Sequence, residues 1–273
     1  MILKLLICLP MVLACSSPRL EKMEEFSAPA PVRFDAGTND KLPELSSYET
    51  EYKFKGKWKN RAKNIKLAAE RLNGFTIEPG ETLSFNEIVG ERTVKRGFVE
   101  APIYFQGIKT LGMGGGVCQV SSTLYAAAMH GRIKVIQRIT HSRPSGYIPK
   151  GMDATVSYPD LDLKLENNYK SKLIIKTKTG EGKIRIAILG INKNFKVKHK
   201  FSGFKGVEQS GRFIEEEGYK GEPKLKQKGK PGLPGIAIWT YTDTQGETKI
   251  TVPSPYRPVD DVWHIEPANG RVE

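Results

Sequence analysis

Cysteine is scarce in this chain of 273 residues, which has three: Cys8, Cys15 and Cys118. With only four histidines, all scattered, the chain lacks the paired Cys and His spacing of zinc sites, so we expect neither a metal nor a cofactor. Long hydrophobic runs are missing as well. No window reaches the roughly 18 consecutive apolar residues that a membrane-spanning helix requires.

The N-terminus carries a short targeting pattern instead. Lys4 precedes an apolar run that ends at Ala14, and Cys15 follows directly. This order is typical of a secretory signal. A small residue before the cysteine resembles the lipobox of bacterial lipoproteins, although Leu13 stands where a small residue is more usual. We expect residues 1–15 to be a lipoprotein-type signal with an acylated Cys15, which would hold the protein to a bacterial membrane on the extracytoplasmic side. An ordinarily cleaved signal and an uncleaved anchor are the alternatives.

The expected processing leaves a single thiol. Cys8 departs with the signal and Cys15 carries lipid, so Cys118 is the only free thiol of the mature chain. No intramolecular disulfide can then form, although exported proteins commonly pair their cysteines. A remaining cysteine is either buried as a small hydrophobe or kept for chemistry.

Negative charge is also in short supply. There are 43 Lys and Arg residues against 30 Asp and Glu, which gives a net charge of +13. Excess positive charge favours anionic partners. Outside the cytoplasm these would be lipid head groups or a cell-wall polymer such as peptidoglycan, and we expect no nucleic acid. The alternative is a solvated lysine-rich surface that only confers solubility.

Composition and periodicity divide the chain into parts. Residues 16–48 are rich in Pro, Ser and Glu, as in a flexible tether. Residues 49–195 combine an amphipathic helix from Trp58 to Leu72 with short β-branched runs that indicate strands. Residues 196–273 are rich in lysine and predict a small β-rich segment, with a hairpin turning near Thr244. The fold class expected is α+β, with a few helices packed on a largely antiparallel sheet.

The stretch GGGVCQVSSTLY places Cys118 in the first turn of a predicted helix, directly after Gly114, Gly115 and Gly116. Unpaired backbone amides and the positive end of the helix dipole favour a thiolate at this place. The glycines would let a substrate backbone lie beside the sulfur. Gln119 and nearby amides could form an oxyanion hole. Ser121 and Ser122 would bond to the helix backbone or pack, and Ser122 shares the Cys118 face and is a candidate for substrate contact.

Chain geometry predicts which residues meet the thiol. The helix from Cys118 to His130 rises roughly 18 Å, and a strand from Ile133 to Thr140 returns about 23 Å. These matched lengths bring His141 back beside Cys118, and a new strand begins nearby at Asp153. Cysteine nucleophile, histidine base and orienting aspartate form the constellation expected of nucleophilic catalysis. Their order resembles the layout of transglutaminase-like and papain-like enzymes.

Each partner also has a structural reading. His141 could hydrogen-bond a loop carbonyl, Asp153 could cap the turn after Gly151, and Cys118 could be a buried, inert thiol. His130, near the helix end, fits a favourable interaction with the helix dipole better than a catalytic base.

Three segments together resemble the VanW family, which is named from accessory genes in bacterial glycopeptide-resistance clusters. They are NRAKNIKLAAERLNGFTIEPGETLSFNEIVGERTVKRGFVEAPIY, GGGVCQVSSTLYAAAMHG and HSRPSGYIPKGMDATVSYPDLDLKLENN, within Trp58 to Ile191. The residues from about Phe201 onward resemble the small β extension that accompanies such domains, which is sometimes likened to G5-type wall modules. The family's motif positions fall on Gly114, Gly115, Gly116, Cys118, Gln119, Ser121, His141, Gly151 and Asp153.

The resemblance implies association with the cell envelope and with peptidoglycan-related processes. Together with the thiol constellation, it leads us to expect a cysteine-dependent hydrolase or acyltransferase that acts on an amide bond of peptidoglycan or a related polymer. A non-catalytic module that binds the cell wall is the alternative, and a structural scaffold with an inert thiol is a third.

Overall fold

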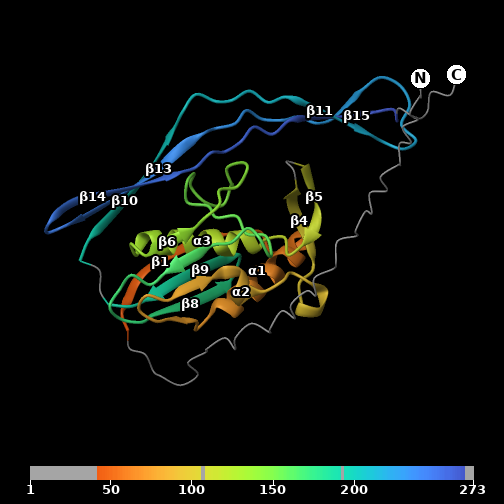
Figure 1. Ribbon diagram of the computed structural model, residues 1–273. Coiled ribbons are helices and arrows are strands. Elements are labelled where there is room, and N and C mark those ends of the chain that lie inside the picture. Colours follow the sequence, from red (N-terminus) through yellow and green to blue (C-terminus); the bar gives the residue numbers. More distant parts are fainter. Residues whose placement is uncertain (1–41, 106–107, 192–193, 268–273) are drawn as a thin grey trace, which may run out of the picture. The chain divides into compact units, whose positions relative to one another are not determined.

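The computed structural model of the protein describes residues 42–105, 108–191 and 194–267, and Figure 1 shows its elements. The expected signal, the acylated Cys15 and most of the expected tether lie outside these residues. In the part described, no helix has both the length and the apolar character needed to cross a bilayer.

A four-stranded antiparallel sheet forms one layer, in the order β1-β9-β8-β2. Its strands are β1 (Glu44–Glu51), β2 (Thr76–Ile77), β8 (Leu173–Gly180) and β9 (Lys183–Leu189). Helix α1 (Lys59–Leu72) packs on β8, and helix α3 (Val117–His130) packs on β1 and β9. Helix α1 buries Ile65, Ala68, Ala69 and Leu72, as its apolar spacing predicted.

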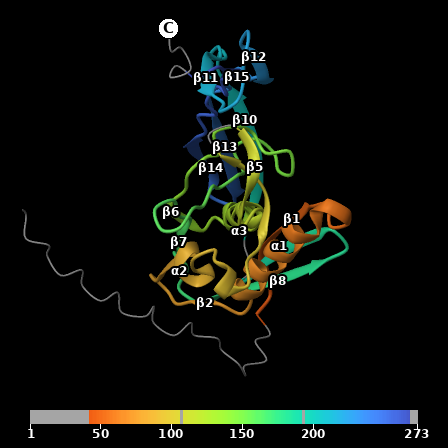
Figure 2. The same ribbon diagram turned by 90° about the vertical axis from the view of Figure 1, so that its right-hand side faces the viewer.

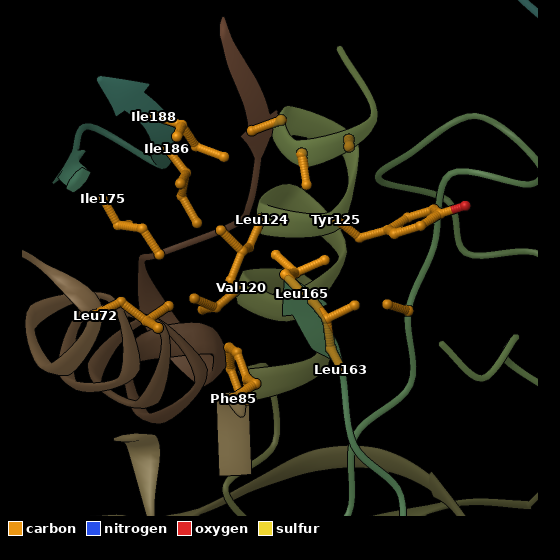
Figure 3. Packing of buried hydrophobic residues seen from close by; sticks show 14 of the residues in the cluster. Leu72, Phe85, Val120, Leu124, Tyr125, Leu163, Leu165, Ile175, Ile186 and Ile188 are labelled. Atoms are coloured by element: carbon orange, nitrogen blue, oxygen red, sulfur yellow. The ribbon is translucent and has the colours of Figure 1, made fainter. Parts of the chain in front are cut away.

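Helix α3 is the centre of the core. All of its residues are buried except Cys118 and His130. Figure 3 shows Val120 and Leu124 between the isoleucines of the sheet and Leu163 and Leu165. Burying one such side chain contributes about 1.5–3 kcal/mol, so α3 is held rigidly in place. A rigid helix fixes the position of whatever projects from its first turn.

Smaller elements surround the two helices. Strands β3 (Thr82–Ser84), β7 (Lys164–Glu166) and β6 (Lys134–Gln137) form an antiparallel sheet, and β4 (Glu100–Phe105) pairs with β5 (Ile108–Met113). The short helix α2 (Phe85–Val89) and the 3-10 turn Val94–Arg96 lie between β3 and β4 in the chain, and a second 3-10 turn, Gly56–Trp58, directly precedes α1. The turned view in Figure 2 shows β4 and β5 rising beside α3.

The C-terminal part consists of two three-stranded sheets. One has the order β10-β13-β14, and the other has the order β11-β15-β12, in which β11 and β15 run parallel. The strands are β10 (Lys196–Gly203), β11 (Gly211–Glu215), β12 (Lys224–Gln227), β13 (Gly235–Asp243), β14 (Gly246–Pro253) and β15 (Asp261–Ile265). The predicted hairpin is β13 and β14. The α+β class is confirmed.

The hydrophobic core crosses the boundary expected at residue 195. Ala237, Trp239 and Tyr241 alternate along β13 and join the same buried cluster as α3. The Tyr241 hydroxyl donates to the Met129 carbonyl at 2.8 Å. By backbone contacts the described residues form one unit. The expected boundary therefore separates two sheets but not two cores.

Three local expectations differ from the structure. Strand β1 begins at Glu44, inside the segment 16–48 expected to be a tether, because it pairs with β9 along its whole length. Strand β6 ends at Gln137, so the return to His141 is completed by chain outside the regular strand. No strand begins at Asp153: residues 152–156 have no regular secondary structure, and the Thr155 amide donates to the Ile139 carbonyl at 2.7 Å.

Candidate active site

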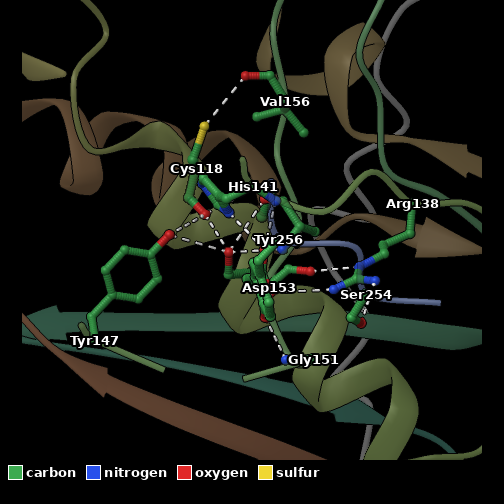
Figure 4. A network of polar contacts seen from close by, with 12 residues as sticks. Cys118, Arg138, His141, Tyr147, Gly151, Asp153, Val156, Ser254 and Tyr256 are labelled. Atoms are coloured by element: carbon green, nitrogen blue, oxygen red, sulfur yellow. Dashed lines mark hydrogen bonds and ion pairs between the residues drawn. The ribbon is translucent and has the colours of Figure 1, made fainter. Parts of the chain in front are cut away.

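Cys118 projects from the first turn of α3, where the sequence placed it. The residue as a whole is partly exposed, and its Sγ donates to the Val156 carbonyl at 3.3 Å. Figure 4 shows the sulfur beside His141 and facing the segment that follows Asp153. Because α3 is buried on nearly every side, the sulfur keeps a fixed position at the edge of the core.

His141 and Asp153 form a tightly bonded pair beside the thiol. The backbone N–H of His141 and its Nδ1 both donate to Oδ2 of Asp153, each at 2.8 Å. Since Nδ1 is used in this way, Nε2 is the ring nitrogen left for the thiol of Cys118. The imidazole and the sulfur are close enough for each to shift the pKa of the other. The structure thus brings the three predicted residues together.

Asp153 is buried and held from three directions. Its side chain accepts from Arg138 Nη2 at 3.2 Å, and Arg138 Nε also bonds its backbone carbonyl at 2.6 Å. The hydroxyl of Tyr256 donates to Oδ1 at 2.5 Å and accepts from the Gly151 amide at 2.6 Å. Neither Arg138 nor Tyr256 was expected from the sequence. Tyr256 comes from the C-terminal part of the chain, 103 residues further on.

These contacts set the protonation state of the site. Burial alone would raise the pKa of Cys118, but the hydrogen bond and charge of His141 lower it. Burial alone would lower the pKa of His141, but Tyr147, Asp153 and Cys118 raise it well above its usual value. For Asp153, His141 and Arg138 outweigh burial and lower the pKa. The three pKa shifts all act in the direction of a thiolate, an imidazolium and a carboxylate.

Ser121 and Ser122 bond to the backbone of α3, as one of their two predicted readings has it, and burial leaves neither hydroxyl facing a substrate. Both are fully buried, and the hydroxyl of Ser121 donates to the Ala154 carbonyl at 2.7 Å, while that of Ser122 donates to the Cys118 carbonyl at 2.7 Å. Ser122 also accepts from the Ala154 amide at 3.0 Å. The two serines fasten the segment next to Asp153 onto α3, so they position the carboxylate.

Gln119 is not available as an oxyanion donor. Its side chain is buried, and its Nε2 donates both hydrogens inside the protein, to Thr50 Oγ1 and to the Glu51 carbonyl, each at 2.9 Å. Its Oε1 accepts from Arg61 Nη2 at 2.8 Å. The side chain points across α3 toward β1, because successive helix residues face directions about 100° apart. The predicted catalytic function of Gln119 is therefore wrong.

The three glycines make room for other parts of this chain rather than for a substrate. A Cβ on Gly114 would lie 2.6 Å from Cγ of Arg92, and one on Gly116 would lie 3.0 Å from Cγ of Arg61. A Cβ on Gly115 would lie 2.7 Å from the backbone oxygen of Ala101. Gly114 and Gly116 also have φ values of +74° and +110°, which favour glycine.

The loop therefore lets two arginines approach the thiol, and the sequence did not point to either of them. Arg61 lies on α1 and Arg92 follows α2, and each interacts electrostatically with Cys118. Burial lowers the pKa of both, that of Arg92 to about 10, so both guanidinium groups remain charged at neutral pH. Within the described ranges, no cluster of His, Cys, Asp and Glu is suited to hold a metal ion.

Fold and site together define an α+β protein with a cysteine–histidine–aspartate constellation at the start of a buried helix. Residues 60–189 match the model of the family described as VanW like protein. Over 130 residues the chain is 40% identical to the uncharacterized protein YoaR of Bacillus subtilis, and over 114 residues it is 37% identical to the vancomycin B-type resistance protein VanW of Enterococcus faecalis. Residues 60–189 of the chain are therefore a VanW-like region.

The match is confined to part of each protein. It covers 48% of this chain and 43% of YoaR, and 40% of this chain and 42% of the Enterococcus protein. The chain therefore aligns with less than half the length of the curated relatives it matches. The family region contains Cys118, His141 and Asp153 and ends at the last residue of β9. Tyr256 lies outside it.

Proposed function

We propose that the protein is a cysteine-dependent enzyme that hydrolyses or transfers an amide-linked acyl group of peptidoglycan or a related envelope polymer. The observation that carries this proposal is the grouping of Cys118, His141 and Asp153, in which Asp153 orients the imidazole and the imidazole lowers the pKa of the thiol. A buried inert thiol would have no reason to lie beside an imidazole oriented by a carboxylate.

The chemistry follows from the positions of the three groups. The Cys118 thiolate attacks the carbonyl carbon of the amide, and an S–C bond forms. The C–N bond breaks, and the amine leaves with the proton from Nε2 of His141. Water or a second amine then attacks the thioester and gives its proton to His141, which restores the thiolate. Asp153 keeps Nδ1 protonated and the ring in place throughout.

The proposed location is the outer side of a bacterial membrane, through a lipid on Cys15. Its support is the order of Lys4, the apolar run and the cysteine, and the excess of basic residues fits an anionic wall polymer or lipid surface. Association that depends on these charges should weaken steeply as salt is added. Salt-insensitive binding would assign the lysines to solubility alone.

A non-catalytic module that binds wall peptide is the second candidate. The engagement of Gln119 inside the protein favours it, because one of the oxyanion donors predicted for an enzyme is then missing. In this alternative the thiolate and imidazolium would only help to recognise a ligand.

The two candidates differ in what they do to wall fragments. Full-length protein and a Cys118→Ala variant are incubated with peptidoglycan fragments, with and without an added amine acceptor, and products are identified by mass spectrometry. An enzyme gives released or newly joined peptides that disappear with the variant, and a trapped thioester on the Cys118 peptide. Identical product profiles, together with unchanged sedimentation of both proteins with the wall, would support the binding module instead.

A further inference from the structure

The surroundings of the thiol contain two positive charges that the proposed mechanism does not use. Arg138 is matched by Asp153. Arg61 and Arg92 have no such partner: among the described residues, no carboxylate oxygen lies within ion-pair distance of either guanidinium group. Asp162 interacts with Arg92 at longer range, but its oxygens accept from Ser84, Asn86 and Leu163.

Both arginines are held in place by neutral groups. Arg92 donates to the Gly90 carbonyl at 2.8 Å and to Asn86 Oδ1 at 2.7 Å. Arg61 donates through Nη2 to Gln119. These contacts fix the positions of the guanidinium groups but do not neutralise them.

The arginines approach the helix start from two sides. Arg61 packs against Gly116, and Arg92 packs against Gly114, so the two stems flank the turn that carries Cys118. The guanidinium carbon of Arg61 also lies 6.0 Å from the ring centre of Tyr147, whose hydroxyl bonds the Cys118 carbonyl at 3.3 Å. Substitution of either glycine would force its arginine away from the thiol.

Resting on the proposed function, we infer that Arg61 and Arg92 form a subsite for a carboxylate of the substrate, next to the bond that Cys118 attacks. A partly desolvated guanidinium with only neutral acceptors gains from an anion, and its planar donor fork fits a carboxylate. A Cys118 thiolate cannot by itself balance the charges of the two guanidinium groups, since its negative charge is already matched by the imidazolium of His141. The substrate class is thus an acyl compound that carries a carboxylate close to the scissile amide.

The test compares two small alkylating reagents of similar size. Iodoacetate and iodoacetamide both lose iodide when the thiolate forms an S–C bond with their methylene carbon, but only iodoacetate carries a carboxylate. The ratio of their second-order rate constants at Cys118 cancels changes in the amount of thiolate. Full-length protein is used, and labelling is read on the Cys118 peptide by mass spectrometry, so that Cys8 and Cys15 do not contribute.

At low ionic strength we expect this ratio to exceed that of glutathione by about tenfold, and to fall toward it as salt is added. Arg61→Gln and Arg92→Gln should each lower the ratio several-fold. Lys63→Gln removes the same charge from an exposed position two residues from Arg61 and should leave it unchanged. A wild-type ratio equal to that of glutathione, or one that neither salt nor the arginine variants alter, overturns the inference. The salt series needs no variant, so it decides the matter even if a variant fails to fold.

Two further arms separate the outcomes. Acetate should protect Cys118 from iodoacetate better than inorganic phosphate at equal ionic strength, whereas stronger protection by phosphate would contradict a carboxylate subsite. If Cys118 prefers the anionic reagent but wall fragments are unchanged, the result supports the carboxylate subsite and contradicts the proposed enzymatic function. If wall products form and the ratio is that of a simple thiol, the inference fails by itself.

Discussion

The VanW-like region and the C-terminal sheets differ in what they contribute to the same site. Residues 60–189 supply the sulfur, the imidazole and the carboxylate, and the buried helix that fixes them. The C-terminal part supplies Tyr256 on Asp153, and the Pro253 carbonyl, which accepts from Arg138 at 3.0 Å. One region carries the reactive groups, and the other holds the acid in position. A family match therefore does not mark the limits of a site.

The two C-terminal sheets also differ from one another. Sheet β10-β13-β14 buries Trp239 and Tyr241 against α3, whereas sheet β11-β15-β12 leaves Phe213 and Leu225 exposed, at 61% and 40%. The comparison teaches that only the first sheet is part of the core. The second depends on its own pairing and on the strands that lead to it.

The largest effect is expected from Asp153→Asn, because Asp153 is the residue through which the C-terminal part contacts the site. It leaves Arg138 buried without its counter-charge, which costs about 3–5 kcal/mol of unfolding free energy. The pKa of His141 should fall because the carboxylate that raises it is lost, so alkylation of Cys118 at pH 6 should slow several-fold. Chemical denaturation and the pH dependence of alkylation measure the two effects.

Asp162→Asn is the matched control for this variant. Asp162 is also buried, but it bonds Ser84, Asn86 and Leu163 and touches none of the three reactive groups. It should lower stability and leave the alkylation profile of Cys118 in place. If both variants alter the profile equally, Asp153 has no special function in the site.

The next effect tests whether β13 belongs to the core. Trp239→Ala removes a fully buried indole and should cost about 3 kcal/mol or more. Because the cluster is continuous with α3, the whole described unit should still unfold in one transition, with thiol exposure coinciding with loss of structure. Ile250→Ala, at an exposed position on neighbouring β14, should cost less than about 1 kcal/mol. A separate early transition of the C-terminal sheets would show two independent units.

Local patterns in the sequence predicted much of the fold. The spacing of Ile65, Ala69 and Leu72 gave the buried face of α1, and the turn before Gly246 gave the β13–β14 hairpin. The return from His130 to His141 was also predicted, although the regular strand is shorter, because the reach of a chain depends little on its hydrogen bonding.

Contacts between distant residues were not predictable in this way. Gln119, Ser121 and Ser122 stand in the first turns beside Cys118, yet their partners, Thr50 and Ala154, are far away in sequence and decide where they point. No local sequence pattern around Arg61, Arg92 or Tyr256 indicates that these residues lie near the site. The sequence thus predicted which residues are reactive. It did not predict which residues orient them, because those contacts arise from packing between distant parts of the chain.

A smaller effect is expected from Tyr256→Phe, which tests the contribution of the C-terminal part directly. Loss of the hydroxyl removes a donor from Asp153 and an acceptor from the Gly151 amide, and should cost about 1–3 kcal/mol. Because the donor stabilises ionised Asp153, its loss should also raise the pH at which rapid alkylation of Cys118 begins.

Tyr241→Phe provides the comparison for that variant. Tyr241 is equally buried on the same side of the core, but its hydroxyl bonds Met129 and not the site. It should cost about 1 kcal/mol and leave the alkylation profile unchanged. Equal profiles for the two variants would mean that Tyr256 is only structural.

The smallest effect concerns pH and the β10-β13-β14 sheet. Burial and the nearby His130 lower the pKa of His199 to about 4, and its ring contacts Trp239. The unfolded chain then binds a proton that the folded one does not, so the contribution of His199 should lower stability as the pH drops from about 6.5 to about 4, and this contribution should be constant below that. Partial exposure of the ring limits this loss to about 1–2 kcal/mol. His199→Gln should flatten the curve between these pH values while leaving the Asp153-dependent loss at lower pH, and an unchanged slope would place the acid sensitivity outside the C-terminal sheet.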